Sequence, residues 1–146
     1  DALPISGGDL AHRGSGAILA GVENPLRPYD NEPPLAVIEL AGAALATSGG
    51  ARRGVIIAGT PYSHVLDPRT ARPVDHTASA TVLAPDAATA DVVATVACVL
   101  PPADALAFVD DLAASNGSAA DTGVVACLLV TPDGVCHTSR WWPAPQ

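Results

Sequence analysis

The stretch TADVVATVACVL places a carboxylate and a hydroxyl four residues apart among apolar neighbours, at Asp91 and Thr95. In a helix this spacing puts both side chains on one face. Oxygen ligands of this kind suit Mg²⁺ better than zinc. Two of them cannot complete a magnesium site, so waters, phosphates or backbone carbonyls would supply the rest. The spacing alone leaves two interpretations, part of a magnesium site or a polar stripe that faces solvent.

A second cluster, SHVLDPRTARPVD at residues 63–75, follows the apolar stretch GVIIAG. His64 could act as an acid, a base or a phosphate donor, because imidazole exchanges protons near neutral pH. Asp67 could orient this histidine, or it could cap the turn before Pro68. The alternative is a polar turn with a structural or exposed histidine. The remaining histidines have no comparable neighbourhood, and we expect them on the surface: His12, His76 and His137.

Two glycine pairs follow predicted strands, in SGGD at residues 6–9 and in TSGG at residues 47–50. Glycine lets the backbone approach a ligand closely, and successive N–H groups can cradle a phosphate. Neither stretch fits the P-loop pattern or GxGxxG. Each is therefore either a phosphate-binding turn or an ordinary one.

Composition narrows the possible partners of the chain. The formal net charge is -8, with fifteen acidic residues and seven basic ones, all arginine. This balance argues against a general binder of nucleic acid or acidic membranes. A phosphorylated ligand would need a metal ion or local arginines to offset the repulsion. The three cysteines show no CxxC spacing, which indicates free or buried thiols rather than a zinc site or a disulfide framework.

The elements that must position these residues are predicted from hydrophobic patterning. We expect strands in AILAGVENP, LAVIELAGAALATSGG (two strands across a Gly bend) and ASATVLAP, and a strand pair GVIIAG–SHVLDP that turns at TPY. Two helices follow, PDAATADVVATVACVL with Asp86 as N-cap and PPADALAFVDDLAASNG, and then a hairpin across PDG. This order predicts an α+β fold with a mainly antiparallel sheet packed against two helices. With only 3% aromatic residues, the core must be built from small side chains.

Taken in order, these pieces resemble the C-terminal half of the ApbE family. The resemblance rests on SGGD, GVENP, ALATSGG, SHVLDPRTARP, SATVLAPDAATADVVATV and DGVCHTSRWW, and its most specific part is HxLDPRT followed by TVLAPDA and AD…AT. Family members are flavin transferases, which take FMN from FAD and attach it through a phosphoester to a Thr or Ser of a target protein. They commonly work outside the cytoplasm as tethered lipoproteins. The resemblance implies FAD as substrate, Mg²⁺ as cofactor and a flavin-acceptor protein as partner.

The resemblance also implies residue roles. Asp91 and Thr95 match the family's magnesium ligands, and His64 matches a histidine beside the flavin pyrophosphate that is a candidate for proton transfer. The remaining matches are to residues that line the FAD site: Gly7, Gly8, Asp9, Thr47, Ser48, Gly49 and Arg53.

The chain departs from the family pattern at Ala71, where the family usually has Gly after DPRT. If that Gly takes positive φ, the turn here must differ. Residues 1–146 are expected to form the C-terminal portion of a flavin transferase domain, without the N-terminal half, which could be a separate chain. Three alternatives stay open: an FAD pyrophosphatase that releases FMN and AMP, a non-catalytic flavin- or metal-binding module, and a structural remnant without a ligand.

Overall fold

A six-stranded antiparallel sheet forms the centre of the computed structural model, which describes residues 2–5, 9–28, 31–50, 53–115 and 124–144. The strand order is β1-β2-β5-β10-β11-β12. The strands of this sheet are β1 (Ala2–Ile5), β2 (Asp9–His12), β5 (Ala44–Gly49), β10 (Ser79–Ala84), β11 (Ala126–Val130) and β12 (Cys136–Thr138). The expected α+β fold with a mainly antiparallel sheet and two helices is confirmed.

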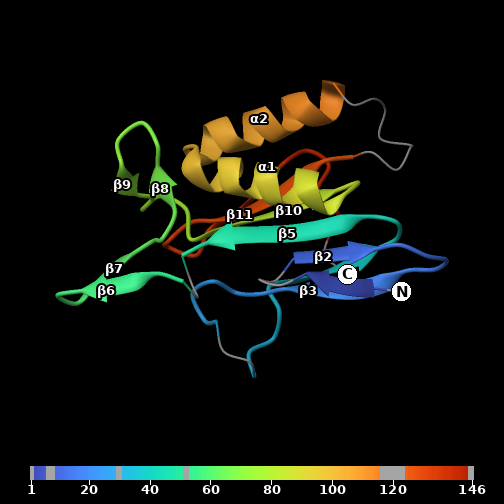
Figure 1. The fold of residues 1–146 in the computed structure, drawn as a ribbon, viewed down its shortest axis with the longest axis horizontal. Coiled ribbons are helices and arrows are strands. Elements are labelled where there is room, and N and C mark those ends of the chain that lie inside the picture. The colour runs from blue at the N-terminus through green and yellow to red at the C-terminus, as the bar shows by residue number, and fades with distance from the viewer. Residues whose placement is uncertain (1, 6–8, 29–30, 51–52, 116–123, 145–146) are drawn as a thin grey trace.

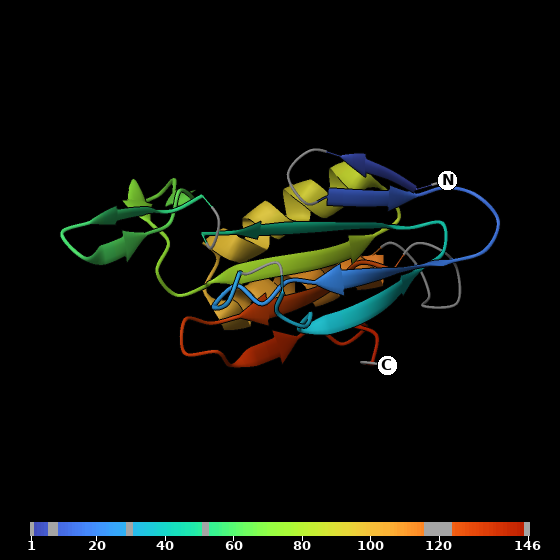
Figure 2. The ribbon, with the colours of Figure 1, turned by 90° about the horizontal axis from the view of Figure 1, so that it is seen from below.

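The sheet lies between two other layers (Figure 1). Helices α1 (Ala87–Val99) and α2 (Pro102–Ser115) cover one face. The hairpin of β3 (Ile18–Val22) and β4 (Ala36–Leu40) covers the other, as the view from below in Figure 2 shows. The LAVIELAGAALATSGG segment does form two strands, but they belong to different sheets, because β4 pairs with β3 and β5 pairs with β2 and β10.

Local sequence signals determine where α1, which carries the candidate metal ligands, begins and ends. Asp86 caps the helix as predicted, because its Oδ1 accepts the Thr89 N–H at 2.9 Å and its Oδ2 accepts the Thr89 hydroxyl at 2.8 Å. These hydrogen bonds hold the pKa of Asp86 below its usual value. The helix ends at Val99, and the next helix starts at Pro102, where a missing N–H costs nothing.

Strand alternation divides the apolar side chains between two cores. The core between helices and sheet is built from Ala, Val, Cys and Leu, and none of its described buried members is aromatic. The core between the sheet and β3–β4 contains Ile38 and Leu40, with Trp142 at its edge. The expectation of small side chains therefore holds for the helix side. Of the three free cysteines, Cys98 and Cys127 are buried and Cys136 is exposed.

The predicted GVIIAG–SHVLDP strand pair is wrong. Strand β6 (Val55–Ile57) pairs instead with β7 (Thr60–Tyr62), so TPY is a strand and the turn is Ala58–Gly59. Both turn residues have positive φ, 49° and 83°, as a two-residue type I′ hairpin requires. The DPRT segment forms a separate ribbon, in which β8 (Leu66–Asp67) pairs with β9 (Arg72–Pro73).

The expectation that His12 lies on the surface is also wrong, since only 3% of the residue is exposed. Its Nδ1 accepts the Gly42 N–H at 3.1 Å, and its backbone N–H donates to the Ala43 carbonyl at 2.8 Å. His12 is the last residue of β2, and its burial depends on how β2 sits between β1 and β5, which a single sequence does not reveal. His76 and His137 are half-buried. Within the described ranges, neither helix is long and apolar enough to span a bilayer.

Candidate functional site

Three elements bring oxygen-bearing side chains together at one end of the helix layer. Asp9 opens β2 and Ser48 lies near the end of β5, while Asp91 and Thr95 lie on α1. Alternation explains the convergence. Ala11 of β2 and Ala46 of β5 belong to the core beneath the helices, so the positions two residues away, Asp9 and Ser48, lie on the same face of the sheet.

Direct contact joins β5 to α1 through two hydroxyls. The Oγ of Ser48 lies 3.4 Å from the Oγ1 of Thr95, within weak hydrogen-bond range. Asp91 and Thr95 are exposed and Ser48 is half-buried. The predicted shared face of Asp91 and Thr95 is therefore present, and it is open to ligands.

The electrostatics of Asp9 extend the site to a second carboxylate. Partial burial and the negative charge of Asp91 raise the pKa of Asp9 above its usual value. A hydrogen bond from the Thr47 backbone and the positive charge of Arg53 act in the opposite direction. Asp9 therefore interacts electrostatically with both Asp91 and Arg53, although the three residues lie far apart in the sequence.

The donor set has the chemistry that a hard divalent cation prefers. It consists of two carboxylates, Asp9 and Asp91, and two hydroxyls, Ser48 and Thr95, without sulfur or imidazole. In the described part of the chain, no three His, Cys, Asp or Glu residues gather into a metal cluster. A cation here would therefore take further ligands from phosphate, from water or from the rest of the polypeptide.

The three residues of the TSG segment play different structural parts. The Thr47 side chain lies on the sheet face opposite the helices, where its Oγ1 is 2.9 Å from Oγ1 of the buried Thr81. Gly49 pairs with Ser79 of β10, and a Cβ at Gly49 would lie 2.5 Å from the Ala78 carbonyl oxygen. Of the three, only Ser48 directs its side chain toward the Asp91–Thr95 face.

Sequence reasoning did not identify Ser79. Its Oγ is buried and has no hydrogen-bond partner among the described residues. The alternating pattern of ASATVLAP predicts a strand, but it does not predict that the hydroxyl of Ser79 is buried.

His64 follows β7 and is exposed. No hydrogen bond or ion pair joins it to Asp91 or Thr95 among the residues that the structure describes. The chain path brings its neighbour close to the TSGG loop, since a Cβ on Gly50 would lie 3.2 Å from Ser63. The next residue, Val65, is buried in the helix-side core and fixes the backbone directly after the histidine.

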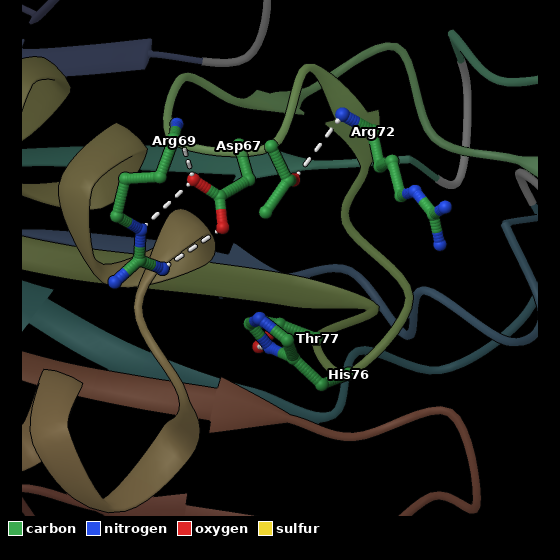
Figure 3. Close-up of polar contacts among 6 residues, drawn as sticks. Asp67, Arg69, Arg72, His76 and Thr77 are labelled. Atoms are coloured by element: carbon green, nitrogen blue, oxygen red, sulfur yellow. Dashed lines mark hydrogen bonds and ion pairs between the residues drawn. The ribbon is translucent and has the colours of Figure 1, made fainter.

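Asp67 serves the turn rather than the histidine, as Figure 3 shows. Its Oδ1 accepts the Arg69 backbone N–H and Nε–H at 2.9 Å each, and its Oδ2 accepts Nη2–H at 2.9 Å. These bonds lower the pKa of Asp67, with a smaller contribution from His76, whose Nδ1 is 2.9 Å from the Thr77 hydroxyl. Of the two roles considered for Asp67, the structure supports the turn cap.

The turn does not change its form to avoid positive φ at Ala71. Ala71 itself adopts φ 55°, and its N–H donates to the Asp67 carbonyl at 2.7 Å. The left-handed conformation is therefore retained with an alanine in it, at a cost in backbone strain.

Two of the predicted FAD-site residues, Gly7 and Gly8, lie outside the described residues. Arg53 is described and exposed, directly before Gly54, whose N–H donates to the Gly50 carbonyl at 2.9 Å.

The fold belongs to a known class of protein. The ApbE family matches residues 2–117, and the chain is a member of that family. An FAD:protein FMN transferase of Escherichia coli K12 is 39% identical over 122 residues, which cover 82% of this chain and 31% of that protein. The enzyme of the same name from Rhodobacter capsulatus is 39% identical over 93 residues, or 64% of this chain and 16% of that protein.

Solved structures of the family share the fold. The ApbE protein of Thermotoga maritima matches with a TM-score of 0.74 and 29% identity, over 92% of this chain and 41% of that one. The flavinyl transferase ApbE of Pseudomonas stutzeri, in its apo form, gives a TM-score of 0.70 and 25% identity, over 97% and 41%. The chain thus spans about a third of the E. coli relative and two fifths of these structures.

Proposed function

We propose that this chain contributes to the Mg²⁺-dependent transfer of FMN from FAD to a Ser or Thr hydroxyl of a target protein. The observation that carries the proposal is the convergence of Asp91, Thr95 and Ser48 in a chain of the ApbE family. The E. coli and R. capsulatus relatives are FAD:protein FMN transferases.

The reaction is a phosphoryl transfer in which the acceptor hydroxyl oxygen bonds to the phosphorus of the FMN unit. The bond between that phosphorus and the bridging oxygen breaks, and AMP leaves with the bridging oxygen. His64 takes the proton of the acceptor hydroxyl. Such transfers depend mainly on positioning and on stabilisation of charge.

Asp91 and Thr95 would hold the magnesium ion, with Asp9 and Ser48 beside them. When bound, the ion supplies Lewis-acid neutralisation of the pyrophosphate oxygens. It would also offset the repulsion between an acidic protein and an anionic substrate, to which Arg53 adds one positive charge near Asp9. The space that the missing Cβ of Gly49 leaves is taken by the Ala78 carbonyl oxygen, so Gly49 would line the FAD site through its backbone.

We further propose that this chain supplies the C-terminal portion of the transferase domain. It matches 31% of the E. coli relative and 41% of the T. maritima structure. The remaining flavin contacts would come from the part of the relatives that this chain does not match, on the same polypeptide or a separate one.

The test is an incubation of the complete polypeptide with FAD, Mg²⁺ and a family acceptor protein, followed by mass spectrometry of the acceptor. We expect a covalent FMN adduct that is lost in Asp91→Ala and reduced by more than tenfold in His64→Ala. Leu19→Ala, on an exposed site of β3, serves as the control and should keep full activity.

Other products would identify the alternatives. Free FMN and AMP without a labelled acceptor would indicate an FAD pyrophosphatase, in which water replaces the acceptor hydroxyl. Binding of FAD without turnover would indicate a non-catalytic module. Either result from an otherwise folded protein would overturn the transferase proposal.

A further inference from the structure

The β6–β7 hairpin projects from the body of the molecule (Figures 1 and 2). All three residues of β6 are apolar and exposed, so apolar side chains lie on both of its faces. Val55, Ile56 and Ile57 are 57%, 77% and 59% exposed. Tyr62, which pairs with Val55, is also exposed. Residues 54–62 contain no charged side chain in a protein of net charge -8. A hairpin that meets only solvent would be expected to carry charges, so this one is suited to contact a partner.

One edge of the hairpin is open for pairing. Among the described residues, β6 and β7 pair only with each other. In a two-residue hairpin, the residues that flank the turn, Ile57 and Thr60, exchange hydrogen bonds, and so does the second pair beyond them, Val55 and Tyr62. The N–H and C=O of Ile56, between these pairs, therefore point away from β7.

The opposite edge is blocked by its sequence. Pro61 lies across from Ile56 and has no N–H, so β7 presents no donor at the corresponding outward position. No proline or charge interrupts β6, and all three of its residues are β-branched, which favours cross-strand packing. An incoming strand would therefore pair with β6.

The base of the hairpin adjoins the candidate site. Gly54, directly before β6, donates its N–H to the Gly50 carbonyl at 2.9 Å. Gly50 follows Gly49 and Ser48, whose Oγ is 3.4 Å from that of Thr95. His64 lies two residues beyond β7. A strand paired along β6 therefore has one end near the residues proposed to act on FAD.

We propose that the β6 edge docks a segment of the acceptor protein by strand addition and brings its Ser or Thr toward His64. This inference rests on the proposed transferase function. The backbone of Ile56 would hold the segment, and the apolar faces of β6 would select uncharged, apolar side chains that flank the acceptor hydroxyl.

The size of the edge favours such a segment over a second copy of the chain. Stable dimers bury roughly 800 Å² on each partner. A strand of three residues offers much less, which suits a weak contact that releases its product after each turnover.

The test compares two variants of Ile56 in the complete polypeptide. Ile56→Pro removes the outward N–H but leaves the β6–β7 hydrogen bonds, whereas Ile56→Asp keeps the N–H and adds a charge to the apolar face. The matched control is Leu19→Asp, because Leu19 is 67% exposed on β3, away from the hairpin. The probe is a purified acceptor protein of the E. coli transferase, with FAD binding measured in parallel.

We expect both Ile56 variants to raise the KM for the acceptor at least tenfold, while the FAD dissociation constant and the Leu19→Asp rates stay at parental values. Unchanged acceptor KM in both variants would overturn the docking inference alone. Loss of a dimer in Ile56→Asp, with labelling intact, would also overturn it and identify a self-association surface. A parent protein that binds FAD but labels no acceptor would instead refute the transferase function and the docking inference together.

Discussion

Asp9 and Asp91 place two negative charges close together, and the repulsion between them destabilises the fold. Burial and the charge of Asp91 both raise the pKa of Asp9, although Arg53 and the Thr47 backbone oppose the shift. Neighbouring like charges are typical of functional sites, where stability is lower than it could be. A divalent cation between the two elements would remove the repulsion.

Replacement of Asp91 by asparagine should therefore lower the pKa of Asp9. A carboxyl with a raised pKa in the folded state favours folding below its unfolded pKa of 3.8, and this contribution is lost as pH rises through the folded pKa. Asp91→Asn should thus make the metal-free protein more stable at neutral pH, and the gain should shrink in acid. Carboxyl NMR titration of Asp9 and denaturation at both pH values measure the effect. An unchanged Asp9 titration would show that the two groups do not interact.

A second prediction concerns the backbone at Ala71. Its φ of 55° lies in the left-handed region, which costs alanine more than glycine. Ala71→Gly should raise the free energy of unfolding by about 0.5–1 kcal/mol, after the greater chain entropy of glycine is counted. Urea denaturation measures this change. A loss of stability would mean that the alanine methyl makes contacts that outweigh the strain.

Strands and helices position the site through close packing at its base. Gly49 lets β5 approach β10, because a Cβ there would lie 2.5 Å from the Ala78 carbonyl and 2.9 Å from Cα of Ser79. Both neighbours are backbone atoms, which cannot move aside as a flexible side chain would. The position of Ser48 beside Thr95 depends on this contact.

Gly49→Ala should accordingly destabilise the fold by about 1–3 kcal/mol, the usual range for overpacking. Gly21→Ala is the control, since a Cβ there meets only the side chain of Pro34 at 3.2 Å and should cost less. Thermal denaturation of the two variants compares them. Equal effects would contradict the specific role assigned to Gly49.

The elements differ in how far the sequence predicts them. Helix α1 was predictable because Asp86, the apolar period and the following prolines all agree. The β6–β7 hairpin was misassigned because Ala58–Gly59 lacks the usual Asn-Gly signal and Pro61 resembles a turn residue. The burial of His12, and the fact that Ser48 rather than Thr47 faces the helices, depend on pairing between distant strands, which local pattern does not specify.

At the scale of the molecule, the helices, the sheet and the β3–β4 hairpin enclose two separate cores. The helix-side core positions α1, and the candidate site lies where α1 meets the ends of β2 and β5. The predicted shared face of Asp91 and Thr95 is present. The proximity of Asp9 to Asp91 was not predicted and is seen only in the folded structure. The motif resemblance identified the family, and the fold showed which of its residues lie together.

We infer that Asp91 and Thr95 hold a divalent cation for a pyrophosphate substrate. Mn²⁺ is an oxygen-seeking, paramagnetic substitute for Mg²⁺, and its binding to the complete polypeptide can be measured by electron paramagnetic resonance. We expect Mn²⁺ binding that tightens with FAD and weakens at least tenfold in Asp91→Ala, but not in the control Leu19→Ala. Equal Mn²⁺ affinity in Asp91→Ala and the parent, with or without FAD, would show that Asp91 does not hold the cation.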